Sequence, residues 1–128
     1  MTRDPVRVAV GCPVARVARL MDAQRIRHVL VVEGERLAGI VSHRDVRGFA
    51  IHEAPDLSLA VDSPVGAAMT ETLVTASPTT TLIDAAREML DRKIGALPIV
   101  EDGRLVGILT KSDVLEALLV WAERSRVA

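Results

Sequence analysis

The stretch that decides the fold reads Gly107-Ile108-Leu109-Thr110-Lys111-Ser112-Asp113. Its first three residues are typical of a buried strand, and the polar residues after them are typical of a helix start. Thr110 and Ser112 belong to residue types that cap helices by accepting backbone N–H bonds. Asp113 places a negative charge in the first helical turn, where the helix dipole stabilises it. Taken alone, the stretch predicts a strand that turns a polar corner into a well-capped helix.

The same pattern occurs earlier in the chain, as Gly39-Ile40-Val41-Ser42-His43-Arg44-Asp45. Adding 68 to any position in residues 1–46 gives its counterpart without a gap. Identical pairs include Met1-Thr2 with Met69-Thr70, Val32-Glu33 with Val100-Glu101, and Asp45-Val46 with Asp113-Val114. An internal repeat of this length fixes the architecture.

Length and composition predict two repeats that share one core. Either half of this 128-residue chain would bury little surface alone and would be only marginally stable. The hydrophobic fraction of 49% and the mean hydropathy of +0.28 suit a compact, well-buried protein. Aromatic residues make up only 2%, so the core must be aliphatic, and the chain lacks an aromatic platform for stacking nucleic-acid bases.

Charge is unevenly distributed along the chain. Residues 1–50 hold nine Arg against five acidic residues, while the remainder holds seven basic and twelve acidic residues. The basic half serves phosphates or is a solvated face, and the sequence leaves both readings open. Because the Arg residues are spread among apolar ones rather than in a run, we expect no nucleic-acid partner.

The sequence also predicts a cellular setting. The lone Cys12 excludes an internal disulfide and fits a reducing compartment. No N-terminal apolar run resembles a signal peptide. The longest apolar stretch, residues 117–122, is far short of the roughly 20 residues that a membrane span needs. We therefore expect a soluble, cytoplasmic protein without a membrane partner.

Hydrophobic patterning predicts the order β-α-β-β-α in each copy, and hence an α+β fold. In the first copy, strands are expected at residues 6–10, 28–32 and 36–41, with one helix beginning at Pro13 and another covering residues 42–52. In the second copy, strands are expected at residues 73–76, 97–100 and 104–109. Its first helix is capped by Thr81 and ended by Gly95, its hairpin turns at Asp102-Gly103, and its closing helix covers residues 111–124.

Several expectations concern packing. Amphipathic helices cover only one face of each small sheet, so we expect the twin sheets to pack together as a pseudo-twofold pair. An apolar stripe is expected on the helix after Thr81, and Pro98 places its strand at an edge or at a strand start. The closing helix has more large apolar residues than one stripe needs, which favours a homodimer interface over extra core; these are Leu115, Leu118, Leu119 and Trp121.

The order of these elements and motifs resembles the CBS domain, named after cystathionine β-synthase. The resemblance rests on Leu97-Pro98-Ile99-Val100, Asp102-Gly103 and the stretch from Leu105 through Thr110 to Asp113, and it covers nearly the whole chain. It implies a tandem pair: a first repeat at 1–52, a linker at 53–63 and a second repeat at 64–128. Such pairs commonly dimerise, and many bind adenine nucleotides or S-adenosylmethionine between their repeats to regulate an enzyme, channel or transporter. The family is not itself catalytic.

The resemblance implies roles for individual residues. Asp113 and Asp45 would bind ribose hydroxyls, since a carboxylate accepts two hydrogen bonds from a vicinal diol. Thr110 and Ser42 would contact a phosphate at a helix N-terminus. The variable corner positions, Lys111 in one copy and His43 and Arg44 in the other, would neutralise phosphates. The residues that would flank the adenine are Val74, Thr75, Gly95, Ala96, Leu97 and Pro98.

The first copy departs from this pattern. Arg27-His28 replaces Gly95-Ala96, and Leu30 stands where Pro98 stands. These two long polar side chains either fill the adenine slot or reach phosphates. We therefore predict that the corner around Thr110 and Asp113 is the better nucleotide site.

Two functions follow from the sequence. The first is a sensor of AMP, ADP, ATP or S-adenosylmethionine whose shape or dimer packing follows occupancy. The second is a dimeric scaffold that binds no ligand and acts on another protein. The three His residues and Cys12 lack metal-ligand spacing, and no nucleophile or phosphate loop stands out. We expect no enzyme, no catalytic cofactor and no metal.

Overall fold

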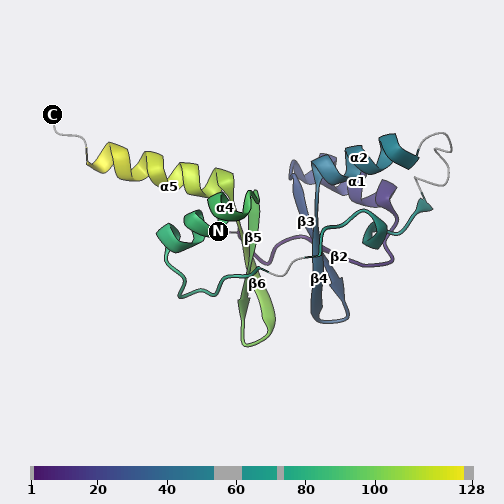
Figure 1. Cartoon of the computed structure of the whole chain (residues 1–128), viewed down its shortest axis with the longest axis horizontal. Coiled ribbons are helices and arrows are strands. Elements are labelled where there is room, and N and C mark those ends of the chain that lie inside the picture. Colours follow the sequence, from purple (N-terminus) through teal and green to yellow (C-terminus); the bar gives the residue numbers. More distant parts are fainter. Residues whose placement is uncertain (1, 54–61, 72–73, 126–128) are drawn as a thin grey trace. The chain divides into compact units, whose positions relative to one another are not determined.

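The computed structural model describes residues 2–53, 62–71 and 74–125, which fall into two units (Figure 1). We call residues 5–53 and 62–71 the N-terminal unit. Residues 2–4 and 74–125 form the C-terminal unit. Of the expected linker, residues 54–61 lie outside the described residues.

The N-terminal unit has the expected β-α-β-β-α order. It consists of β2 (Arg7–Ala9), α1 (Val14–Gln24), β3 (His28–Glu33), β4 (Arg36–Ser42) and α2 (His43–Glu53). The sheet order is β2-β3-β4, with β2 parallel and β4 antiparallel to β3. Pro13 is the N-cap of α1 and lies one residue before its first turn. The core is aliphatic, as the composition predicts, and includes Val17, Met21, Val29, Val31, Val41 and Val65.

The C-terminal unit repeats the helix–hairpin–helix part of this plan. It contains β1 (Thr2–Arg3), α4 (Leu82–Arg92), β5 (Ala96–Glu101), β6 (Arg104–Thr110) and α5 (Lys111–Arg124). The sheet order is β1-β6-β5, so β5 is an edge strand of this sheet, as Pro98 predicts. Asp102 and Gly103 both have positive φ, which confirms the expected hairpin turn. The core consists of Ala76, Ala85, Met89, Leu97, Ile99 and Leu109.

A short segment pairs with the outer edge of each hairpin, which the sequence does not predict. Thr2 pairs with Ile108 in the C-terminal unit, and Thr70 pairs with Ile40 in the N-terminal unit. These two pairings are equivalent under the repeat offset of 68. A further element of the N-terminal unit is η1 (Val65–Ala67), whose Val65 is fully buried in the unit's core. The two structural units therefore do not have the same boundaries as the two repeats expected from the sequence. Residues 2–4 belong to the C-terminal unit, and residues 64–71 belong to the N-terminal unit.

Helix α4 corrects two expectations. It ends at Arg92, and Lys93 rather than Gly95 takes the left-handed cap conformation, with φ of 55°. Arg25 does the same after α1, with φ of 54°. The expected apolar stripe is only partly buried, because Ala85 and Met89 pack inward while Leu90 is 76% exposed.

The strand expected at residues 73–76 is also wrong in its described part. Only Ala76 pairs there, through a single parallel bridge to Ile99. In the first copy the Leu30 N–H donates to the Val6 carbonyl over 3.2 Å. The equivalent donor in the second copy is Pro98, which has no N–H. At the other end of the ladder, the Val10 N–H donates to the Val32 carbonyl over 3.0 Å, and its counterpart Pro78 likewise has no N–H. Two prolines thus explain why the second ladder is shorter.

Candidate functional site

The corner between β6 and α5 is a reciprocal capping box. Asp113 Oδ2 accepts hydrogen bonds from the Thr110 backbone N–H, at 2.8 Å, and from Thr110 Oγ1, at 3.1 Å. In return, the Asp113 N–H donates to Thr110 Oγ1 over 3.4 Å. Thr110 is the N-cap of α5, so the well-capped corner expected from the sequence is confirmed.

The corner between β4 and α2 has the same design. The Ser42 N–H donates to Asp45 Oδ2 over 2.9 Å, and the Asp45 N–H donates to Ser42 Oγ over 3.0 Å. All four side chains of the two corners are half-buried. The repeat in the sequence therefore produces two copies of one hydrogen-bonded structure.

Both carboxylates keep one oxygen available. Within the described part of the chain, the bonds that Asp113 and Asp45 accept all go to Oδ2, which leaves Oδ1 for another donor. The hydroxyls differ, because Thr110 donates to Asp113 whereas Ser42 donates to none of the described residues. Each corner thus offers an acidic acceptor beside a helix N-terminus, where backbone N–H groups favour anions.

Small residues at and just before the start of β5 lie beside the Thr110 corner. Ala96 is directly opposite Thr110 in the β5–β6 pairing, and the Gly95 carbonyl accepts the Lys111 N–H over 3.1 Å. Leu97 and Pro98 continue into the core, while Lys111 is exposed. Val74 and Thr75 lie just before the bridge between Ala76 and β5. The structure therefore brings the second-repeat site residues together in the C-terminal unit.

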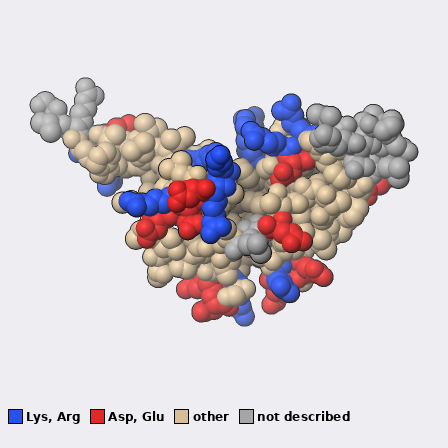
Figure 2. Space-filling view, in the orientation of Figure 1, with Lys and Arg blue, Asp and Glu red and all other residues tan. Residues whose placement is uncertain are grey.

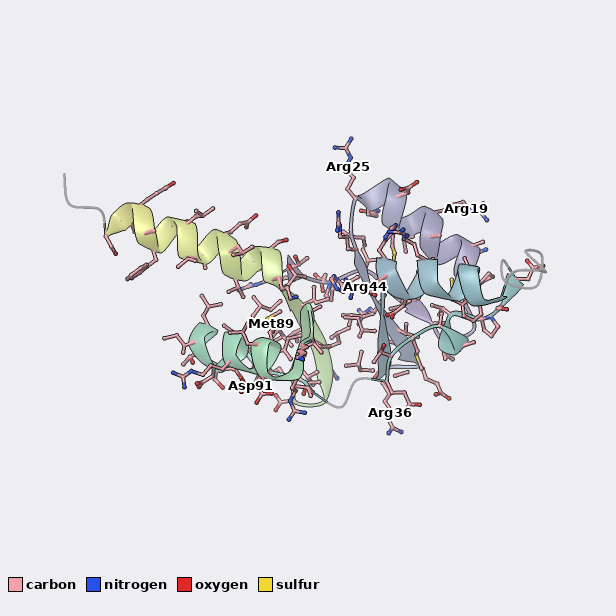
Figure 3. All side chains as sticks on the ribbon, turned by 45° about the horizontal axis from the view of Figure 1, so that its top comes forward. Arg19, Arg25, Arg36, Arg44, Met89 and Asp91 are labelled. Carbon is pink, nitrogen blue, oxygen red and sulfur yellow. The ribbon has the colours of Figure 1, made fainter. Side chains whose placement is uncertain are left out.

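The residues predicted for the first-repeat site lie in the N-terminal unit. Basic side chains occupy the positions that small residues occupy in the second repeat. The Arg27 carbonyl accepts the His43 N–H over 2.7 Å, and His28 is opposite Ser42 in the sheet. Arg27, His43 and Arg44 are exposed, and His28 is half-buried. Figure 3 shows Arg44 at the start of α2 and Arg25 at the end of α1.

Within the described ranges, none of these Arg side chains is paired with a carboxylate. Among the described residues the single ion pair is Arg92 with Glu88, at 2.7 Å within α4. Arg25, Arg27 and Arg44 thus carry positive charge that no described carboxylate neutralises by an ion pair.

A small groove of about 160 Å³ lies elsewhere in the C-terminal unit, and sequence reasoning missed it. Its lining includes Ala76, Pro78, Thr80, Leu82 and Ile99 and is mainly apolar. The run of hydroxyl residues before α4 is the only sequence signal for it. The described residues contain no group of three or more His, Cys, Asp or Glu side chains placed to hold a metal ion. Nor does any helix in the described ranges have the length and apolar character to cross a membrane.

Comparison with protein families matches the CBS domain twice, at residues 1–52 and 65–120. The chain belongs to the CBS domain family. As a member of this family, the chain is a regulatory module that binds a ligand, and it has a mixed α/β fold. Both properties agree with what the resemblance implies.

Two related proteins are similar in sequence to this CBS pair. An uncharacterized protein of Methanocaldococcus jannaschii is 42% identical, over 91% of this chain and 88% of that one. Inosine-5'-monophosphate dehydrogenase of Staphylococcus aureus is 37% identical over 74% of this chain, which spans only 18% of that enzyme. This second match therefore shows no catalytic domain here.

Two solved structures share the fold over nearly the full length. A putative acetoin utilization protein from Vibrio cholerae is 33% identical, with a TM-score of 0.81 over 100% of this chain and 94% of that one. The protein CBSX2, solved in complex with AMP, is 30% identical, with a TM-score of 0.79 over 94% and 93% of the two chains.

Proposed function

We propose that this CBS pair is a sensor of an adenosine-containing ligand, which is AMP, ADP, ATP or S-adenosylmethionine. The observation that carries the proposal is the Thr110–Asp113 corner, where a carboxylate oxygen remains available beside a helix N-terminus and small residues. Support comes from CBSX2, which holds AMP on the same fold at 30% identity.

The corner's chemistry suits a nucleoside phosphate. Asp113 Oδ1 accepts from a ribose hydroxyl while Oδ2 keeps its bond from the Thr110 backbone N–H. The Thr110 hydroxyl exchanges Asp113 for a phosphate oxygen, and Lys111 neutralises the phosphate charge. The pocket for the planar base is expected beside Gly95 and Ala96, where there is little side-chain volume.

Pro98 adds a reason for ranking this corner above the first-repeat corner. Because Pro98 has no N–H, it donates no hydrogen bond to the Val74 carbonyl, whereas the Leu30 N–H donates to the Val6 carbonyl. The Val74 carbonyl is then free to accept from the adenine amino group. In the first repeat that acceptor is already used, and Arg27 and His28 add bulk where Gly95 and Ala96 leave space.

The proposal also includes the protein's partners, which are a second copy of the chain and an effector protein. Large apolar side chains are exposed along α5, including Trp121 at 65%, which favours a homodimer. Occupancy of the ligand site would change this dimer's shape or packing and so act on an effector protein in the cytoplasm. The exposed α5 also supports a second candidate function, a dimeric scaffold that acts without any ligand.

A thermal-shift screen separates these two functions. The ligands are AMP, ADP, ATP, S-adenosylmethionine, GTP and NAD, each at saturating concentration. A ligand at 100 times its Kd stabilises the folded state by about 2.7 kcal/mol, so a sensor's melting temperature rises with at least one adenosine compound. No shift with any compound would support the scaffold and exclude the sensor.

A further inference from the structure

The groove of about 160 Å³ in the C-terminal unit is equivalent to the site that Val65 fills in the N-terminal unit. The repeat offset of 68 relates the residues that line the groove to residues of the core cluster that contains Val65. The related pairs are Val14 with Leu82, Val17 with Ala85, Val31 with Ile99, and Val41 with Leu109. Among the described residues, therefore, only the N-terminal unit closes this site with a side chain of its own.

Three backbone hydrogen bonds hold the segment around Val65 in the N-terminal unit. Their donors and acceptors are Val65 N–H with the Cys12 carbonyl at 2.7 Å, Gly66 N–H with the Val10 carbonyl at 3.0 Å, and Val14 N–H with the Ser63 carbonyl at 2.9 Å. The Val65 side chain is fully buried. Main-chain bonds and one apolar anchor thus fix this segment together.

The C-terminal unit has the same three main-chain groups, and none of them has a partner among the described residues. They are the carbonyls of Pro78 and Thr80 and the N–H of Leu82. The apolar lining is also less covered, because Leu82 is 43% exposed whereas its counterpart Val14 is 5% exposed. Figure 2 shows the surface below α4, over the segment that leads into this helix, as uncharged. The groove therefore suits an uncharged chain segment.

The size and position of the groove also suit such a segment. An apolar cavity of roughly 150 Å³ takes up a molecule as large as benzene, so one aliphatic side chain fits here. In the N-terminal unit the chain runs from Val65 to Thr70, which pairs with Ile40. The equivalent pairing of Thr2 with Ile108 is present in the C-terminal unit. A segment in the groove would therefore continue an interface that this unit already has.

We propose that this groove docks a partner protein through an extended Pro-Val or Pro-Ile segment, in the way that the N-terminal unit holds its own residues 63–66. The partner's β-branched side chain enters the groove. Its main-chain N–H groups donate to the Thr80 and Pro78 carbonyls, and one of its carbonyls accepts from the Leu82 N–H. Main-chain bonds of this kind provide affinity, and the pocket provides specificity.

The N-terminal unit also indicates which residues flank the anchor. Pro64 is extended, with φ of −66° and ψ of 143°, so a proline before the anchor sets the required backbone in advance. The residue after the anchor is small, because a Cβ on Gly66 would lie 2.7 Å from Val10 Cγ2. This docking site is separate from the Thr110–Asp113 corner, so the inference goes beyond the proposed ligand sensor.

An NMR titration of the isotope-labelled full chain with a peptide of residues 63–70 tests the proposal. The peptide contains the Ser-Pro-Val-Gly segment and is blocked at both ends to remove its terminal charges. At millimolar peptide, we expect saturable shifts at the amides of Leu82, Ala85 and Ile99. The same peptide with Val65→Asp should bind at least about 10-fold more weakly, because it would bury an unpaired charge.

Two neighbouring variants show whether the groove itself is used. Leu82→Asp places a charge in the lining and should raise the Kd of the unchanged peptide at least about 10-fold. Ile83→Asp is the matched control, since Ile83 is 66% exposed and does not line the groove, and it should change the Kd less than about threefold. Both variants place an acidic residue in the first turn of α4, where the helix dipole favours it.

Four results would overturn the proposal. The first is an absence of saturable binding at millimolar peptide, and the second is equal weakening by Leu82→Asp and Ile83→Asp. The third is a set of shifts confined to the amides around Val65, which would mean that the peptide replaces the chain's own segment. The fourth is a set of shifts at Leu82 and Ile99 that grow with protein concentration alone, which would assign the groove to a second copy of this chain.

Discussion

Among the described glycines of the N-terminal unit, Gly39 has the least room for a side chain. A Cβ built on Gly39 lies 2.6 Å from the Thr70 carbonyl oxygen and 2.9 Å from Met69 Sδ. Contacts this short force the Ile40–Thr70 pairing to shift, and overpacking of this kind typically costs about 1–3 kcal/mol. We therefore expect Gly39→Ala to lower the free energy of unfolding by that amount in urea titrations.

Gly48 is the matched control for this substitution. It lies in α2, and a Cβ there meets nothing within 4 Å. Because alanine favours helix over glycine, Gly48→Ala should stabilise the protein by about 0.5–1 kcal/mol. If the two variants have equal stability, the close approach of Thr70 to β4 is wrong.

At the scale of single elements, the contribution of a helix cap to stability can be measured at the start of α4. Thr81 Oγ1 accepts the Asp84 N–H over 3.1 Å. We expect Thr81→Ala to cost about 1 kcal/mol of unfolding free energy and to reduce hydrogen-exchange protection in the first turn of α4. Thr79→Ala, an exposed hydroxyl two residues earlier, is the control and should cost less than half as much.

The individual elements also show which local features can be predicted from the sequence. Caps and turns depend on residues close in sequence, so Thr110 to Asp113, Thr81 to Asp84 and the Asp102-Gly103 turn are all predictable. Lys93 is not, because glycine is the usual left-handed residue. Here the Lys93 N–H donates to the Leu90 carbonyl and the Ile94 N–H to the Met89 carbonyl, which ends the helix before Gly95. The strand before Ala76 fails for a related reason. Its pairing depends on a missing donor at Pro98, in a distant part of the chain.

At the scale of the molecule, the repeat predicts two α/β hairpin units, but it cannot predict which short segments pair with them. β1 has only two residues, and its pairing with β6 depends on contacts far apart in sequence. For the candidate site, the sequence predicts the two corners. The structure adds that both Asp side chains already cap a helix, so any loss of binding on substitution must be separated from loss of the cap.

Isothermal titration of AMP into the wild type, Asp113→Asn and Asp45→Asn tests the central claim most directly, because asparagine keeps a side-chain oxygen for the cap and loses the charge. A hydrogen bond to a charged group contributes about 1.5–3 kcal/mol, so Asp113→Asn should raise the Kd for AMP roughly 10- to 100-fold. Asp45→Asn should change it less than about threefold. Abolished binding in Asp45→Asn with unchanged binding in Asp113→Asn would contradict the account.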